Sequence, residues 1–268
     1  MHPVLFRIGN FEVPSFGVMM VLAFLAGMWI ATVRAQRYGI TKQQIQDASF
    51  WALLAGILGA RIVFIVQEIP YYLEHPDQLL TLRFQGLTSF GGLIFGALAV
   101  MVWCRRNRVP VLNMLDVAAP GFLIGHVIGR FGCLLNGCCF GSACPPDTPW
   151  AITVSGSPYL HHPAQVYDAL MNAVVLGLLL LLERRNALRL GEMTGLTLAL
   201  HGLTRFIYEF WRAGTVEEVR KNVASSTYWG SLPITQAQAM ALVLVLVGFG
   251  VTVYYHRRKR ETVEGASE

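Results

Sequence analysis

The sequence is poor in charged residues. Only 14% of its 268 residues are Asp, Glu, Lys or Arg, whereas 54% are hydrophobic. A soluble domain carries about 25% charged residues. The deficit excludes an ordinary soluble protein and indicates an integral membrane protein.

The sequence also lacks a fixed-period repeat, a low-complexity linker and a polar stretch long enough for a soluble catalytic domain. Residues 1–268 are therefore expected to form a single polytopic membrane domain. Any chemistry must then come from helix ends and outer loops. The first apolar stretch lacks a basic leader and is longer than the apolar run of a signal peptide, so it is expected to remain as a helix.

Seven apolar windows reach the length of about 17 to 25 residues that a helix needs to cross a bilayer. Three carry no charge, and four contain a few ionisable residues. The predicted fold is an all-α integral membrane protein with seven transmembrane helices and irregular outer loops. The windows are 15–32, 48–66, 87–103, 112–135, 164–182, 193–211 and 234–255.

Basic residues are concentrated in alternate loops. Thirteen of the 21 Lys and Arg residues follow the first, third, fifth and seventh windows. Because cytoplasmic loops retain basic residues, the N-terminus is predicted outside and the C-terminus in the cytoplasm. Juxtamembrane clusters of this kind suit anionic inner-leaflet lipid, so nucleic acid is not an expected partner.

Three arginines, Arg61, Arg130 and Arg205, lie inside the windows. Each costs about 2.5 to 3.5 kcal/mol at a helix centre, so the cost must be offset. One interpretation is that Asp116, Asp168 and Glu209 pair with them and only hold helices together. The other is a functional polar cavity. His201, Arg205 and Glu209 recur at four-residue spacing on one helix face, which favours the cavity.

The stretch GRFGCLLNGCCFG, residues 129–141, combines Arg130 with several glycines near an outer helix end. Glycines allow a turn that exposes N–H groups, and these can bind an oxyanion beside a guanidinium group. A phosphate-binding corner is one interpretation. Helix packing through small residues is the other.

The same stretch begins a cysteine pattern, C-x4-C-C-x4-C. Zinc ligands usually come as pairs separated by two to four residues, with the pairs some distance apart, so this spacing fits a metal site poorly and no metal is expected. A disulfide from Cys138 or Cys139 to Cys144 is permitted outside the cell. The thiols could also be reactive near Arg130, or they could be inert packing groups. The pattern comprises Cys133, Cys138, Cys139 and Cys144.

These residues resemble the prolipoprotein diacylglyceryl transferase family. Its signature runs approximately G-R-x-G-N-F-x-N-G-E-x-x-G, and residues 129–141 retain its arginine, glycines and second asparagine. Five further stretches match in the same order, so the resemblance covers almost the whole chain. They are GAR at 59–61, SFGG at 89–92, DVAAP at 116–120, HPAQVYDAL at 162–170 and RFIYEFWR at 205–212.

The resemblance implies transfer of the diacylglyceryl group of phosphatidylglycerol to the thiol of a lipobox cysteine in a prolipoprotein. The products would be a thioether and glycerol phosphate, and no cofactor would be needed. It also implies a multi-pass protein of the bacterial cytoplasmic (inner) membrane, with its active site toward the outer face. The expected partners are phosphatidylglycerol, the prolipoprotein lipobox segment and the membrane.

The polar pattern and the resemblance together predict the site. Arginines would stabilise the charge that develops on the phosphate leaving group. Glu209 would orient Arg205 or accept the thiol proton, with His201 and His162 as rival bases. The predicted catalytic residues are Arg130, Arg205, Glu209 and His201. The predicted phosphatidylglycerol-binding residues are Arg130, Arg61, Asn136, Gly141, His162, Gln165 and Tyr167.

Five positions depart from the family pattern. Cys133 stands where the resemblance places an asparagine and Cys138 where it places a glutamate. Phe90 replaces a histidine, whereas Phe16 and His201 replace tyrosines. The chain could therefore be a divergent member with another acceptor, or an inactive relative.

Two other functions remain open from the residues alone. Buried arginines could line the path of an anion transporter, although the paired inverted repeats of many transporters are not evident. The outer cysteines could serve a membrane thiol oxidoreductase, although its usual C-x-x-C pair is absent from the sequence.

Overall fold

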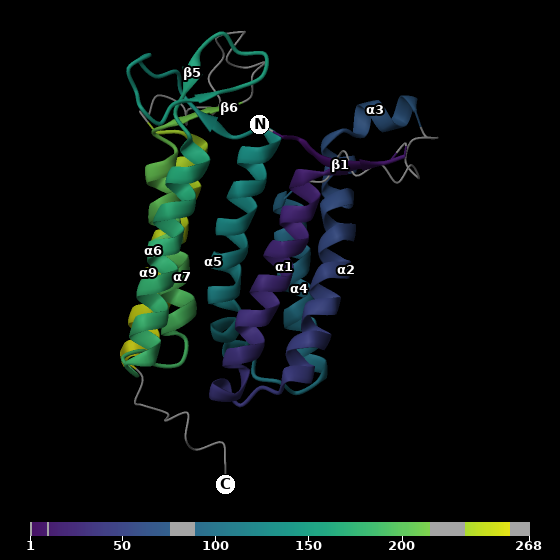
Figure 1. The fold of residues 1–268 in the computed structure, drawn as a ribbon. Helices are drawn as coiled ribbons and strands as arrows, with labels where there is room; N and C mark the ends of the chain where they lie inside the picture. The colour runs from purple at the N-terminus through teal and green to yellow at the C-terminus, as the bar shows by residue number, and fades with distance from the viewer. Residues whose placement is uncertain (1, 10, 76–88, 215–233, 258–268) are drawn as a thin grey trace. The chain divides into compact units, whose positions relative to one another are not determined.

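The structure is a computed structural model that describes residues 2–9, 11–75, 89–214 and 234–257 (Figure 1). Most of these residues are helical. The chain divides into two compact units, Thr32–Met114 and a larger unit made of Met1–Ala31 and Leu115–Glu268. Parts of the predicted outer loops, 76–86 and 215–233, lie outside the described residues.

The smaller unit is built on two long helices that pack through glycine. A Cβ on Gly91 would lie 2.5 Å from the carbonyl oxygen of Gly59, so the two backbones approach too closely for a side chain there. The helix that contains Gly59 begins with a capping box between Thr41 and Gln44. The elements are η1 (Ala35–Tyr38), α2 (Lys42–Gln67), α3 (Ile69–Glu74) and α4 (Ser89–Arg106).

The larger unit contains all the predicted site residues except Arg61, and Figure 1 labels its helices. Its first and second helices meet at Gly27 and Gly121, where a Cβ on Gly27 would lie 2.9 Å from the Gly121 carbonyl oxygen. The helices are α1 (Ser15–Arg34), α5 (Val111–Asn136), α6 (Ala164–Arg184), α7 (Glu192–Tyr208) and α9 (Gln236–Arg257). The last residues of α1 and the first residues of α5 belong to the smaller unit.

Short antiparallel strands form three pairs. Residues 142–163, between α5 and α6, are rich in proline and small polar residues, which predicts an irregular or short-stranded loop, and the two two-residue strands within them confirm this. The N-terminal hairpin was not predicted, although Gly9 and Asn10 lie between two β-prone runs. The pairs are β1 (Val4–Ile8) with β2 (Phe11–Pro14), β3 (Phe140–Gly141) with β6 (Arg212–Gly214), and β4 (Ile152–Thr153) with β5 (Leu160–His161).

Within the described residues, five helices are long and apolar enough to cross a membrane. This confirms a mostly helical integral membrane protein, whereas the count of seven spans and the orientation stay predictions. One predicted boundary is wrong, because the window 193–211 is too long. α7 ends at Tyr208, and the chain turns into β6 at Arg212.

The carboxylate of Asp116 caps the N-terminal end of α7. Its carboxylate accepts hydrogen bonds from the backbone N–H groups of Gly191 at 2.6 Å and Thr194 at 2.9 Å. The first amides of a helix have no partner within the helix, so a buried carboxylate there satisfies them and suits the helix dipole. Asp116 thus fixes α7 against α5.

Candidate active site

A buried ion pair joins α5 to α6. Nε of Arg130 lies 2.5 Å from Oδ2 of Asp168, whose side chain is fully buried. The same oxygen lies 2.9 Å from Nε2 of His126, and Oδ1 accepts a hydrogen bond from Asn172 at 2.8 Å. A buried carboxylate with this many partners is satisfied, and it holds the guanidinium group in one orientation.

The polar network continues from α6 to α7. Asn172 donates its amide N–H to Asp168, so its carbonyl oxygen is the atom that meets Nδ1 of His201 at 2.8 Å. Nδ1 must therefore carry the proton, and in the neutral ring Nε2 carries the lone pair. His201 is therefore in the tautomer whose Nε2 can accept a proton.

Tyr208 brings the two predicted catalytic arginines together. The guanidinium carbon of Arg130 lies 4.7 Å from the centre of the Tyr208 ring, and that of Arg205 lies 4.9 Å from it. The ring is 1% exposed, and its hydroxyl donates to the carbonyl oxygen of Cys139 at 3.1 Å. An aromatic face attracts cations, so one ring positions both arginines.

Glu209 lies at the end of α7 between two arginines. Its Oε2 lies 2.5 Å from Nη1 of Arg205, which confirms the predicted four-residue pair, and its Oε1 lies 3.6 Å from Nη1 of Arg212. Together with the Arg130–Asp168 pair, three guanidinium groups face two carboxylates. Arginines gathered at one place in this way suit the binding of an anion.

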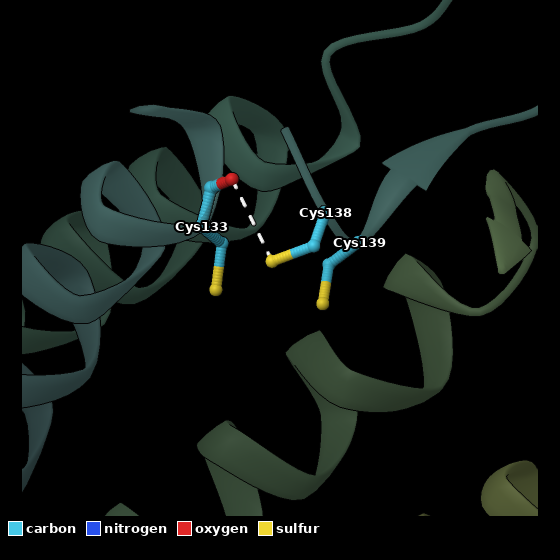
Figure 2. A group of neighbouring side chains, drawn as sticks. All are labelled: Cys133, Cys138 and Cys139. Atoms are coloured by element: carbon cyan, nitrogen blue, oxygen red, sulfur yellow. Dashed lines mark hydrogen bonds between the residues drawn. The ribbon is translucent and has the colours of Figure 1, made fainter. Parts of the chain in front are cut away.

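A tight turn after α5 carries Cys138 and Cys139, and Cys133 lies in the last turn of the helix before it. Gly137 has φ 74° and Cys139 has φ 60°, a left-handed conformation that is uncommon for a residue with a side chain. The Sγ atoms of Cys133, Cys138 and Cys139 all lie within 4.8 Å of one another (Figure 2). None of the five cysteines, all of which lie in described segments, forms a disulfide.

The Cys139 thiol lies in an electropositive setting. Hydrogen bonds with the thiols of Cys133 and Cys138 lower its pKa, and the charges of Arg130 and Arg212 lower it further, against the opposing effect of burial. Cys139 is therefore the member of the cluster that loses its proton most readily.

Gly141 is a close-packing position rather than a free anion donor. Its N–H donates to the carbonyl oxygen of His162 at 2.8 Å. A Cβ there would lie 2.7 Å from the Cβ of His162 and 2.8 Å from the carbonyl oxygen of Trp211. Any side chain would push the outer segment away from the end of α7. The amide that the sequence suggests as an exposed donor at this glycine is already engaged.

The other predicted lipid-binding residues of this unit lie at the end of α5 and around the start of α6. Nδ2 of Asn136 donates to Sγ of Cys138 at 3.6 Å, and Nε2 of Gln165 donates to the Cys138 carbonyl oxygen at 2.7 Å. Oε1 of Gln165 is buried without a hydrogen-bond partner in the described part of the chain. Nδ1 of His162 and the hydroxyl of Tyr167 lie 3.2 Å apart.

Arg61 belongs to the smaller unit. Its guanidinium carbon lies 6.0 Å from the centre of the Phe64 ring and 5.7 Å from that of Tyr72, a residue that is 8% exposed. Within that unit the charge is placed against aromatic rings, which offsets part of its insertion cost.

A family model described as prolipoprotein diacylglyceryl transferase matches residues 3–254. The chain belongs to the prolipoprotein diacylglyceryl transferase family. Three of its relatives bear the name phosphatidylglycerol–prolipoprotein diacylglyceryl transferase. The chain is 34% identical to that of Pseudoalteromonas atlantica over 213 residues, which cover 78% of this chain and 75% of the relative. It is 33% identical to that of Geobacter sulfurreducens over 214 residues, covering 78% and 82%. It is 30% identical to that of Clostridium tetani over 217 residues, covering 79% and 86%.

Family membership confirms the resemblance drawn from the motifs. Three residues that connect the site in the structure are not among the predicted site residues. These three, Asp168, Asn172 and Tyr208, join the predicted residues to one another. The available signal was position, because Asp168 and Tyr208 lie inside matched stretches and an aspartate within an apolar window is functional by default. Asn172 had no such signal.

Proposed function

We propose that this member of the family transfers the diacylglyceryl group of phosphatidylglycerol to the thiol of a lipobox cysteine in a prolipoprotein and releases glycerol phosphate. The single observation that carries the proposal is the placement of Arg130 and Arg205 against one Tyr208 ring, at 4.7 and 4.9 Å. Two oriented guanidinium groups at one place suit a phosphodiester whose phosphate becomes a leaving group.

The arginines act by electrostatic stabilisation. As the bond from carbon to the phosphate oxygen breaks, negative charge grows on the phosphate, and donors already oriented toward that charge lower the barrier. Asp168 orients Arg130, and Glu209 orients Arg205. Neither arginine then needs to reorganise when the phosphate leaves.

The acceptor thiol must lose a proton before it attacks. His201 is the proposed acceptor, because its Nδ1 is committed to Asn172 and its Nε2 carries the lone pair. Glu209 is engaged with two arginines and serves to orient them. His162, the rival base, lies beside Tyr167 instead.

The headgroup glycerol is proposed to bind at the start of α6. The buried Oε1 of Gln165 has no partner among the described residues, and a glycerol hydroxyl can donate to it. Asn136, His162 and Tyr167 border the same turn and complete the proposed lipid site. Gly141 contributes by letting the outer segment approach, and Arg61 is kept as a proposed lipid contact.

The proposed site faces the outer side of a bacterial inner membrane. α4 has 18 residues and α7 has 17, within the range of a span, so seven spans are proposed with the N-terminus outside. The site lies at the C-terminal ends of α5 and α7 and the N-terminal end of α6, which belong to one side of the membrane in that topology. The basic loops belong to the opposite side.

The proposal is tested by reconstituting the full chain in phosphatidylglycerol vesicles with a lipobox peptide. The peptide is expected to gain the mass of a diacylglyceryl group, and glycerol phosphate is expected in the supernatant. A peptide with serine in place of the lipobox cysteine is expected to gain nothing. The proposal fails if the cysteine peptide stays unmodified while the Geobacter sulfurreducens relative modifies it in parallel.

A matched pair of variants separates the site from general charge effects. Arg205→Gln is expected to lose about 100-fold or more of the turnover, as loss of a charge-stabilising donor does. Arg7→Gln removes the same charge from an exposed pair with Glu12, whose side chains are 69% and 52% exposed, and is expected to keep full turnover. Equal losses in both variants would contradict the role of Arg205.

A further inference from the structure

The three cysteines near the end of α5 form a convergent sulfur cluster. Cys133 extends from the last turn of α5, and the chain then turns back through Gly137 so that the sulfur of Cys138 points toward Cys133 and Cys139 lies beside Cys138 (Figure 2). Their three Sγ atoms lie within 4.8 Å of one another, and all three residues are partly exposed. Sulfurs bound at about 2.3 Å to one tetrahedral ion are about 3.8 Å apart, so closure by about 1 Å or less suffices.

The backbone around the cluster is held in place. The carbonyl oxygen of Cys138 accepts from Gln165 at 2.7 Å, and that of Cys139 accepts from Tyr208 at 3.1 Å. Asn136 donates an N–H to Sγ of Cys138 at 3.6 Å. Hydrogen bonds of this kind fix the ligands of metal sites and tune their sulfurs. The left-handed backbone of Cys139 is thus kept in the conformation that holds its sulfur near the other two.

A disulfide accounts poorly for this arrangement. Cys138 and Cys139 are neighbours in sequence, and consecutive Cα atoms are about 3.8 Å apart, below the usual span of a disulfide. A disulfide from Cys133 to either of them would leave the third sulfur without a role. Three converging sulfurs instead match the ligand number of a zinc site that keeps one position open.

We propose that Cys133, Cys138 and Cys139 bind one Zn²⁺ ion and leave its fourth position to the sulfur of the acceptor cysteine. Three protein ligands with a fourth, exchangeable position are the arrangement of catalytic zinc. The ligand set is soft and anionic, which favours Zn²⁺ over hard cations such as Mg²⁺. Arg130, one turn before Cys133, places the bound sulfur close to the proposed phosphate site.

The role of the ion rests on the proposed function. The acceptor thiol gives its proton to His201 and binds the ion as a thiolate in place of water. Its sulfur then attacks the glycerol carbon of the lipid and forms the carbon–sulfur bond. The bond from that carbon to the phosphate oxygen breaks, and its electron pair leaves with glycerol phosphate. A metal-held thiolate is present at neutral pH without a strong base nearby.

Zinc binding is tested directly on the purified full chain, with no use of transferase activity. The reduced, metal-stripped protein is titrated with Zn²⁺ against a chromophoric chelator, and separately with Co²⁺ to detect sulfur-to-cobalt charge-transfer absorption. One tight equivalent and a thiolate band are expected. Cys133→Ser and Cys139→Ser are each expected to weaken binding at least 100-fold. Cys144→Ser, a cysteine outside the cluster, is expected to bind as wild type does.

Three outcomes would overturn the site. The wild-type protein could bind no more Zn²⁺ than the triple serine variant of the cluster, or Cys144→Ser could weaken binding equally. Mild oxidation could instead give an internal disulfide within the cluster while the reduced protein binds no metal, which would show a redox pair. Circular dichroism on each variant establishes that it is folded, so that lost binding is not lost structure.

The open position is tested with a lipobox peptide added to the Co²⁺-loaded protein. The charge-transfer band is expected to shift and intensify with the cysteine peptide and to stay unchanged with its serine counterpart. No shift would remove the acceptor role. A shift without any lipid transfer would leave the zinc site standing and count against the proposed function, so the two failures are distinguishable.

Discussion

α7 meets its neighbours through two faces of opposite character. Toward α9 it presents Gly195 and Gly202, where an added Cβ would lie 2.4 Å from Oγ1 of Thr252 and 2.9 Å from the carbonyl oxygen of Ala241. Toward α5 and α6 it presents His201, Thr204 and Tyr208, which are hydrogen-bonded or stacked against polar partners. At its two glycines the first face is held by backbone proximity, with one polar contact at the start of α7, where Glu192 lies 2.8 Å from His256. The second face is held by directed polar contacts.

The difference separates stability from positioning. In a membrane, helices associate through close packing of small residues, because lipid tails are as apolar as side chains. The glycine face therefore contributes to the assembly of the unit without placing any reactive group. The polar face orients charged side chains. Burying such groups in a membrane is energetically unfavourable, so they are usually kept for a function. Substitutions on the two faces should consequently change different measured quantities.

Substitution of Arg130, which contacts the polar face of α7 through the Tyr208 ring, is expected to have the largest effect on activity. Arg130→Gln is expected to lower kcat/KM for lipid transfer by about 1,000-fold, because it removes a guanidinium group from the developing phosphate charge. Arg130→Lys keeps the charge but loses the planar fork that meets Asp168, and is expected to recover only a small part of the rate. Rates are measured with the lipobox peptide at fixed phosphatidylglycerol content. Full activity of the glutamine variant would remove Arg130 from the chemistry.

Asp168 is expected to have the next largest effect, because it acts through Arg130. Asp168→Asn keeps the size of the side chain and one acceptor oxygen but loses the charge that pairs at 2.5 Å. Loss of an orienting partner typically costs about 10- to 100-fold in activity. The fall is expected in kcat more than in KM for the peptide. A loss equal to that of Arg130→Gln, with a lower melting temperature, would indicate a purely structural pair.

The sequence was informative wherever the interaction is local. The Arg205–Glu209 pair was predictable because residues four apart on a helix are neighbours. The Arg130–Asp168 pair joins two helices, and hydropathy carries no information about which faces meet. The contact of the Tyr208 ring with Arg130 was missed for the same reason, because Arg130 comes from α5, whereas the contact with Arg205 lies within α7.

The cysteines and the end of α7 show how tertiary structure overrides a linear pattern. Cys133, Cys138 and Cys139 are not arranged as the two separated pairs of common zinc motifs, yet the turn at Gly137 brings their sulfurs together. The apolar residues after Tyr208 extend the predicted helix, whereas β6 pairs with β3 and ends it earlier. The first result depends on a local backbone turn, and the second on a contact between segments that are distant in sequence.

The ring and the hydroxyl of Tyr208 make different contacts, and two substitutions can remove them separately. Tyr208→Phe keeps the ring between the arginines and removes the hydrogen bond to Cys139, worth about 1 kcal/mol. Activity is expected to fall by about 5-fold, the factor that corresponds to a free energy of this size. Tyr208→Leu also removes the cation contacts and is expected to fall further. The comparison is made on kcat/KM, and equal losses in the two variants would show that the ring has no part in placing the arginines.

Gly202 tests the other face and is expected to have the smallest effect on the chemistry. A Cβ there would meet the Ala241 carbonyl oxygen at 2.9 Å and Val245 at 3.0 Å, so Gly202→Ala is expected to destabilise the α7–α9 pair by about 1 to 3 kcal/mol. Gly177→Ala is the matched control, because nothing lies within 4 Å of its added Cβ, and alanine there favours the helix. Thermal unfolding in detergent should rank Gly202→Ala below wild type and Gly177→Ala at or above it. Turnover per folded molecule should be unchanged in both. If Gly202→Ala lowered turnover without lowering stability, the glycine face would also position the reactive groups, and the two faces of α7 could not be treated as separate.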